Sequence, residues 1–143
     1  MIGDMQKWTP NVAGIIEHAR EIHPKTEVIS RLVSGEIHRT NYEEVCIRSR
    51  KLGSALEKDG VKKGDVVATL ALNTYRHLEM YYGISGMGAI THTLNFRLHP
   101  EQAIYIINHA EDKIIFVELP FVPILEGLQD KLSTVEKYIV LCE

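Results

Sequence analysis

The chain has 143 residues, of which 45% are hydrophobic and 24% are charged. This balance is typical of a soluble globular domain with its own core, and it excludes a disordered chain. The formal net charge of −3 with neutral histidine predicts no basic surface for nucleic acid or for an anionic membrane. The longest mainly apolar stretches, residues 66–72 and 114–117, are too short for a transmembrane helix.

The beginning of the sequence and the two cysteines indicate the compartment. Residues 1–4 show no basic segment followed by an apolar run, so we expect no secretory signal. Cys46 and Cys142 form neither a C-x-x-C pair nor a disulfide framework. We expect both to be reduced thiols, buried or half-buried, in a cytoplasmic protein.

The first segments predict a helix and a hairpin. Apolar residues recur at helical spacing in residues 11–22, and Pro24 stops that helix. Residues 26–33 and 36–39 are then predicted as two strands joined by a tight turn at residues 34–35.

A capping box predicts where the next helix begins. The hydroxyl of Thr40 can accept an early helical N–H, and Glu43 can reach back to the N–H of Thr40. Gly60 ends this helix, because glycine takes positive φ at little cost.

From residue 63 onward, strands and helices alternate with short links. Strands are predicted at residues 66–72, 89–94, 114–117 and 138–141, and helices at residues 74–87, 100–109 and 121–132. Such alternation predicts a parallel sheet with right-handed crossover helices. The expected fold class is α/β: a three-layer parallel-sheet subdomain with crossover helices, preceded by a helix and a β-hairpin. We place a helical arm at residues 1–24 and the α/β subdomain at residues 25–143.

Three glycines, Gly83, Gly86 and Gly88, could suggest a phosphate-binding loop. Such a loop follows a strand directly, whereas these glycines fall late in a predicted helix. We interpret them as close helix-to-sheet packing and a helix stop. The sequence also contains neither G-x-x-x-x-G-K-[ST] nor a Ser/Thr/Gly-rich loop that ends in lysine.

The histidines and acidic pairs give no metal or catalytic pattern. There is no H-E-x-x-H, and His92 and His99 share no ligand spacing with a cysteine or an acidic residue. The acidic pair at residues 43–44 suits a helix N-terminus, and the pair at residues 111–112 is expected in a solvated turn. No metal ligand and no catalytic residue is predicted.

One loop supports a ligand hypothesis. Residues 93–101 leave the carboxyl end of a predicted strand, which is where open α/β sheets bind ligands. Phe96 and Arg97 offer an apolar ring and a fixed cation. The structural alternative is that Arg97 ties the loop to a neighbouring carboxylate or carbonyl, while Phe96 and Leu98 only pack.

This loop and the segment before it resemble the adenylate-forming ligases, which include the acyl-CoA synthetases and the luciferases. The family pattern GD.VA…N…GxxxxGA…N.RL.P.E…I runs without a gap through residues 64–107. Residues 41–56 resemble a further helix of the family. Residues 92–95 and 108–113 are most similar to medium- and long-chain fatty-acyl-CoA synthetases. The resemblance covers about residues 26–143.

The resemblance implies ATP-dependent activation of a fatty acid through acyl-AMP to acyl-CoA, with Mg²⁺ and CoA. The family's phosphate loop, metal-binding acid, ribose-binding acid and mobile lysine have no match in these residues, so we expect the chain to be inactive alone. By resemblance, Asn95, Phe96 and Arg97 lie near the acyl and pantetheine path, and Lys113 is placed where some members contact the CoA nucleotide.

Three hypotheses follow. In the first, the chain is the N-terminal fragment of a fatty-acid–CoA ligase, which supplies scaffold and contacts for a homodimer or larger assembly. In the second, it is a stand-alone interaction module that assembles with a separately encoded catalytic partner. In the third, it is a small enzyme or nucleotide binder that reuses the fold.

Overall fold

The computed structural model describes residues 11–142. The elements in chain order are α1 (Val12–Ile22), β1 (Glu27–Arg31), β2 (Ile37–Asn41), α2 (Tyr42–Lys58), β3 (Val66–Leu70), α3 (Tyr75–Gly86), β4 (Ile90–Thr93), α4 (Pro100–His109), β5 (Asp112–Glu118), a 3-10 turn η1 (Leu119–Phe121), α5 (Val122–Glu126), a second 3-10 turn η2 (Gln129–Lys131) and β6 (Lys137–Leu141). No helix among these is both long and apolar enough to span a bilayer.

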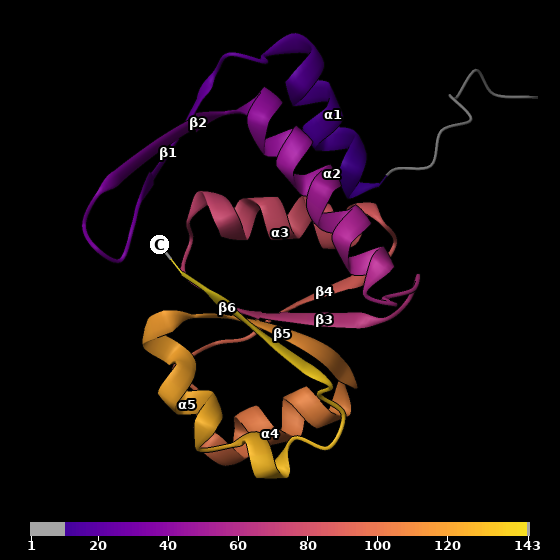
Figure 1. Ribbon diagram of the computed structural model, residues 1–143, viewed down its shortest axis with the longest axis vertical. Helices are drawn as coiled ribbons and strands as arrows, with labels where there is room; N and C mark the ends of the chain where they lie inside the picture. Colours follow the sequence, from indigo (N-terminus) through magenta and orange to yellow (C-terminus); the bar gives the residue numbers. More distant parts are fainter. Residues whose placement is uncertain (1–10, 143) are drawn as a thin grey trace, which may run out of the picture.

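The centre of the fold is a four-stranded sheet in the order β4-β3-β5-β6, in which every neighbouring pair is parallel. Helices α1, α2 and α3 lie on one side of this sheet, and α4 and α5 lie on the other (Figure 1). Strands β1 and β2 form a separate antiparallel hairpin. The predicted three-layer α/β class, with a leading helix and hairpin, is therefore confirmed.

Two clusters of buried side chains hold the layers together. On the α2–α3 side, Val67 and Phe116 of the sheet pack with Leu56, Met80 and Ile84 of the helices. On the α4–α5 side, the cluster contains Ala68, Leu70, Ile107, Ile115, Val117, Leu125, Leu128 and Leu132. Strands β3 and β5 thus place alternate apolar side chains into two cores, which explains why each is a continuous apolar run.

Helix α2 begins one residue later than predicted. Asn41, not Thr40, is the N-cap: its φ is −140° and its side-chain oxygen accepts the N–H of Glu44 at 2.9 Å. The Thr40 hydroxyl instead donates to the Glu44 carboxylate at 2.6 Å. The predicted capping box at Thr40 and Glu43 is wrong, because strand β2 continues through Asn41 and delays the first helical turn.

Helices α2 and α3 approach each other closely at Gly83. A Cβ atom at this position would lie 2.8 Å from the carbonyl oxygen of Ser49 and 3.0 Å from a methyl carbon of Leu52. This glycine therefore serves packing between two helices, and the predicted helix-to-sheet contact is corrected. Gly88 follows the end of α3 with φ +89°, so it is a helix stop as predicted.

The region predicted as one helix at residues 121–132 is broken into η1, α5 and η2. Pro120 and Pro123 each stand at the start of one of these short pieces, where the missing N–H is tolerated. The chain leaves the α-helix at Gly127, after five helical residues. Leu125, Leu128 and Leu132 recur at a helical spacing, and all three are buried. This spacing led to the prediction of a single helix.

Candidate functional site at the carboxyl end of the sheet

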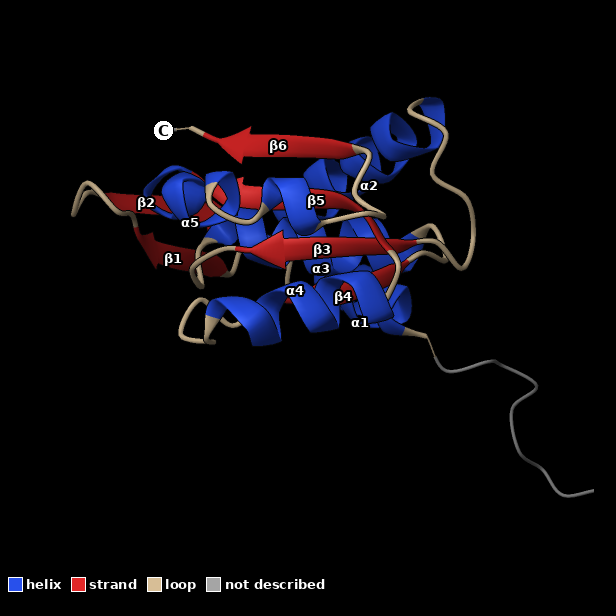
Figure 2. Ribbon diagram, turned by 90° about the horizontal axis from the view of Figure 1, so that it is seen from below, coloured by secondary structure: helices blue, strands red, loops and turns tan. Residues whose placement is uncertain are grey.

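The chain path creates a topological switch point at the carboxyl ends of β3 and β5. From β3 the chain crosses to β4 through α3 on one face, and from β4 it returns past β3 to β5 through α4 on the other face. The connections that leave β3 and β5 therefore turn to opposite faces. Strands β3 and β6 point toward this edge in Figure 2, and β4 and β5 run parallel to them. Such a switch point is where doubly wound sheets bind ligands.

Glu118, at the end of β5, links the two strands at this switch point. Its carboxylate accepts the N–H of Leu72 from the β3–α3 connection at 2.8 Å, and the residue is only 2% exposed. The contact joins two strands that lie 46 residues apart in sequence. Sequence reasoning missed Glu118, although a lone acid at the end of a buried apolar strand was a signal that could have found it.

A second buried polar pair lies beside the same connection. The hydroxyl of Thr69 on β3 and Nε2 of His77 on α3 are 3.0 Å apart, and both residues are buried. Burial lowers the pKa of His77, and a hydrogen bond with the backbone of Leu72 partly opposes that shift. His77 is therefore neutral near pH 7 and holds the start of α3 against β3.

The loop after β4 brings together three of the four predicted site residues. The Asn95 side-chain oxygen accepts the N–H of Arg97 at 3.0 Å, and the Phe96 ring stacks on Phe121 with 4.9 Å between centroids. The Arg97 guanidinium lies 5.3 Å from the centre of the Phe96 ring. Phe96 packs, as the structural alternative proposed. Arg97 lies over the Phe96 ring, whereas that alternative expected it to bind a carboxylate or a carbonyl.

The exposed side chains at this loop and after β5 are mixed: Asn95, Arg97 and His99 are polar, and Phe96, Leu119 and Ile124 are apolar. Phe96 is 40% exposed, and Leu119 and Ile124, which follow β5, are 59% and 39% exposed. A fixed cation next to exposed rings and aliphatic side chains suits a ligand with an apolar body and an anionic group.

Lys113 does not join this loop. It is the second residue of β5, so it lies at the amino end of the sheet, whereas the loop leaves the carboxyl end of β4. Its ammonium group donates to Asp65 at 2.8 Å. This hydrogen bond lowers the pKa of Asp65 and raises the pKa of Lys113.

Asp112, expected in a solvated turn, is fully buried. The chain enters β5 earlier than predicted: Glu111 takes the left-handed turn conformation with φ 57°, and Asp112 becomes the first strand residue. Nδ1 of His92 lies 2.9 Å and 3.0 Å from its two carboxylate oxygens. Burial raises the pKa of Asp112, and His92 opposes the shift.

The carboxyl-end site does not fit ATP or Mg²⁺ by itself. The β3–α3 connection, residues 71–74, contains no glycine, and its Leu72 N–H already binds Glu118. A phosphate loop needs free N–H groups at a helix N-terminus. Among residues 11–142, no group of three or more His, Cys, Asp or Glu side chains could hold a metal ion. The role left for the described residues is to shape and orient a ligand, because they provide no cradle for phosphate and no metal site.

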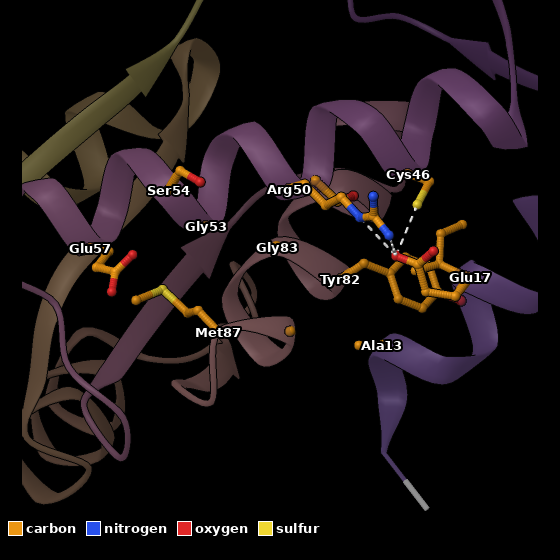
Figure 3. Close-up of a pocket in the computed structure, with 13 residues that line it drawn as sticks. Ala13, Glu17, Cys46, Arg50, Gly53, Ser54, Glu57, Tyr82, Gly83 and Met87 are labelled. Carbon is orange, nitrogen blue, oxygen red and sulfur yellow. Dashed lines mark hydrogen bonds and ion pairs between the residues drawn. The ribbon is translucent and has the colours of Figure 1, made fainter.

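A separate hollow of about 430 Å³ lies between α1, α2 and α3. Figure 3 shows Glu17 at one end of this hollow, where Arg50 donates to the carboxylate at 2.8 Å and the Cys46 thiol donates at 3.4 Å. Cys46 is 1% exposed, and burial raises its thiol pKa, so it is an unreactive thiol. Cys142 is exposed, unlike the buried or half-buried thiol that was expected.

The fold and this edge define a doubly wound α/β subdomain with a switch point at the carboxyl end of its sheet, and residues 11–142 contain no phosphate cradle. Solved structures share this architecture. An anthranilate CoA ligase in complex with anthranoyl-AMP superposes with a TM-score of 0.85 at 22% identity, over 96% of this chain and 26% of that one. A Mycobacterium tuberculosis fatty acyl CoA synthetase gives a TM-score of 0.82 at 21% identity, over 92% and 26% of the two chains.

The family described as AMP-binding enzyme matches residues 16–142, so the chain belongs to that family. It is 44% identical over 133 residues to a long-chain-fatty-acid–CoA ligase of Thermus thermophilus, which covers 93% of this chain. It is 42% identical over 141 residues to a medium-chain-fatty-acid–CoA ligase of Ectopseudomonas oleovorans and 40% identical to a 3-methylmercaptopropionyl-CoA ligase of Ruegeria lacuscaerulensis. The chain spans about a quarter of the length of these relatives.

Proposed function

We propose that the chain is the N-terminal subdomain of a fatty-acid–CoA ligase, which converts a medium- or long-chain fatty acid to acyl-AMP and then to acyl-CoA. The observation that carries this proposal is the identity of 42–44% to medium- and long-chain ligases over nearly the whole chain. In this proposal ATP, Mg²⁺ and CoA bind mainly to the rest of the enzyme. The subdomain contributes the scaffold and the loop after β4, which carries Asn95, Phe96 and Arg97.

Within this proposal, the exposed ring of Phe96 lies along the acyl path. Lys113 keeps its proposed contact with the CoA nucleotide as a separate hypothesis, at the other end of the sheet. We also propose a cytoplasmic enzyme that forms a homodimer. The outward side of the hairpin supports self-association, because Ile29 and Ile37 are 54% and 50% exposed there.

A chimera tests the proposed activity. In the Thermus thermophilus ligase, the aligned segment is replaced by this chain, and pyrophosphate release is measured with ATP, Mg²⁺, CoA and fatty acids of increasing length. We expect fatty-acid-dependent release by the chimera and none by the chain alone.

Replacing Phe96 with Asp in the chimera should raise the KM for the fatty acid at least tenfold, because the carboxylate repels the substrate anion and removes apolar surface. The matched control is Tyr105→Asp, at an exposed aromatic residue on α4. A folded chimera without activity on any fatty acid would overturn the proposed function.

A further inference from the structure

Strand β4 is the edge strand from which the loop with Asn95, Phe96 and Arg97 leaves. It has four residues, and among residues 11–142 it pairs only with β3. Ile90, its first residue, is 52% exposed. A short strand with a single neighbour has few backbone hydrogen bonds, so side-chain contacts contribute much to its position. The contact that His92 makes is therefore of interest.

His92 reaches from β4 across β3 to Asp112 on β5. His92 is in register with Ala68 of β3, and Asp112 is in register with Val66 on the other side of that strand. Neighbouring strands lie about 4.8 Å apart, so β4 and β5 are separated by about 10 Å. The side chain of β3 beside His92 is the methyl group of Ala68, which is small enough to leave room for the imidazole. Nδ1 lies 2.9 Å and 3.0 Å from the two carboxylate oxygens, and this contact bridges two strands that are not neighbours.

The backbone of β5 is irregular where it presents Asp112. The register between β3 and β5 shifts by one residue, which makes Lys113 an extra residue in β5. Ile114 packs on the α2–α3 side, and regular alternation would turn Asp112 to that side as well. The extra residue turns it to the α4–α5 side, and Glu111 before it has the left-handed φ of 57°. Bulges redirect side chains and are frequent beside functional sites, so this irregularity indicates a role for the contact with His92.

The hydrogen bond between the two side chains has a defined direction. A carboxylate only accepts hydrogen bonds, so Nδ1 of His92 carries the proton and donates it to Asp112. Asp112 is fully buried, and water cannot take the place of His92 as its partner. Hydrogen bonds to a charged acceptor are also stronger than those between neutral groups. The bridge therefore holds β4 firmly from its α4–α5 side.

Strand β4 continues directly into the loop that follows it. Leu94 comes two residues after His92, and its N–H donates to the carbonyl of Thr69 at 2.9 Å. Phe96 and Arg97 follow within three residues of Leu94. A displacement of β4 would therefore displace the Phe96 ring and the Arg97 cation with it.

We propose that His92 is a positioning residue for fatty-acid binding. Its hydrogen bond to Asp112 fixes β4 and, through β4, the loop with Asn95, Phe96 and Arg97. In this proposal His92 itself does not touch the fatty acid. The inference rests on the proposed function, since it takes that loop to bind the fatty acid.

Two substitutions separate the hydrogen bond from the other properties of the imidazole. Asparagine offers an N–H donor in the place of Nδ1, whereas leucine has a similar size and no donor. In the Thermus chimera, His92→Leu should raise the KM for the fatty acid at least fivefold and change kcat less than twofold, because the loop binds the ground state and the transition state alike. His92→Asn should stay within twofold of the unmodified chimera. Equal impairment by both substitutions would overturn the bridge.

Leu132→Ala is the control for a general loss of stability. Leu132 is buried in the α4–α5 core, in the segment that leads to β6, so its truncation should lower the melting temperature and leave the bridge in place. Kinetics are measured below the melting temperature of every variant, and Leu132→Ala should keep the KM within twofold. If Leu132→Ala raised the KM as much as His92→Leu does, loosening of the core would be the cause and the positioning role would be wrong.

Hydrogen exchange in the chain alone gives a second measurement that does not depend on activity. The Leu94 amide should exchange at least tenfold faster in His92→Leu than in Leu132→Ala, and His92→Asn should restore slow exchange. If His92→Leu does not fold, His92→Leu with Asp112→Asn takes its place, because that pair leaves no buried charge without a partner.

The outcomes separate this inference from the proposed function. An active chimera in which the Leu94 amide and the KM do not respond to His92→Leu would overturn the positioning role and leave the function standing. A folded chimera without activity, together with faster exchange at Leu94 in His92→Leu, would overturn the function and leave the bridge between β4 and β5 standing.

Discussion

The two ends of the parallel sheet are built differently. At the amino end, charged groups are matched within the subdomain: Lys113 binds Asp65, and His92 binds Asp112. At the carboxyl end, the buried polar groups hold the backbone in place, as Glu118 does with Leu72, while exposed apolar side chains such as Phe96 and Leu119 lie near the exposed cation of Arg97. The amino end therefore secures the fold, and the carboxyl end presents a surface to a ligand, as the general rule for such sheets states.

The largest effect is expected at the amino end, for Asp112→Ala. This change leaves His92 without its buried partner, and removal of the fully buried carboxylate leaves a cavity. The free energy of unfolding should therefore fall by about 3 kcal/mol. Urea unfolding followed by circular dichroism measures it. Asp112→Asn, whose amide oxygen can still accept a hydrogen bond, should recover most of the loss.

The partly exposed pair of Lys113 and Asp65 at the same end serves as the comparison. Lys113→Met should change the unfolding free energy less, because this ion pair is partly exposed and is therefore partly screened by water and salt. If Asp112→Ala lowered the free energy of unfolding as little as Lys113→Met, the desolvation cost of the buried Asp112 carboxylate would be equal to the stabilisation from its pairing with His92. The amino end would then contribute no stability through charge.

A smaller effect is expected at the carboxyl end, for Glu118→Ala. The N–H of Leu72 would lose its acceptor in a buried place, at a cost of about 2 kcal/mol. Hydrogen exchange of the Leu72 amide should accelerate more than exchange in α4. Glu118→Gln keeps an acceptor oxygen and should restore slow exchange. Unchanged exchange in Glu118→Ala would show that the β3–α3 connection is fixed by other contacts.

The smallest effect is a pH dependence that arises from His77. Because its pKa is lowered in the folded chain, the unfolded chain takes up the proton first, near its ordinary pKa of about 6.5. The stabilising effect of neutral His77 is therefore complete above that pH and is lost as the pH falls through the folded pKa. Unfolding free energies between pH 7.5 and pH 5 should decline more steeply in the wild type than in His77→Gln. Parallel curves for the wild type and His77→Gln would contradict the assignment of this pH dependence to His77.

Much of the fold could be predicted from the sequence, because strands β3 and β5 and helices α3 and α4 have strong local patterns. Errors arose where a local pattern competed with the chain path. Residues 121–132 contain leucines at helical spacing, but Pro123 and Gly127 divide the segment. Asp112 was misplaced because the turn ends at Glu111, whose left-handed backbone no spacing rule reveals.

The site was less predictable than the fold. The loop with Asn95, Phe96 and Arg97 was found because it follows a strand directly. Glu118 and His77 were missed, since their partners are Leu72 and Thr69, and only the folded crossover brings these residues together. Lys113 is likewise separated from the loop, because it stands at the amino end of β5 whereas the loop follows the carboxyl end of β4.

The close approach of α2 and α3 at Gly83 has a consequence for variation in this chain. An alanine methyl group would press on the backbone carbonyl of Ser49, which a rotamer change cannot relieve, so the two helices must separate. Those helices carry Leu56, Met80 and Ile84 into the same core as β3. Overpacking of this kind costs about 1–3 kcal/mol, and each kcal/mol lowers the melting temperature of a domain this size by about 3 °C. One base change in the Gly83 codon is thus enough to make a heat-sensitive allele.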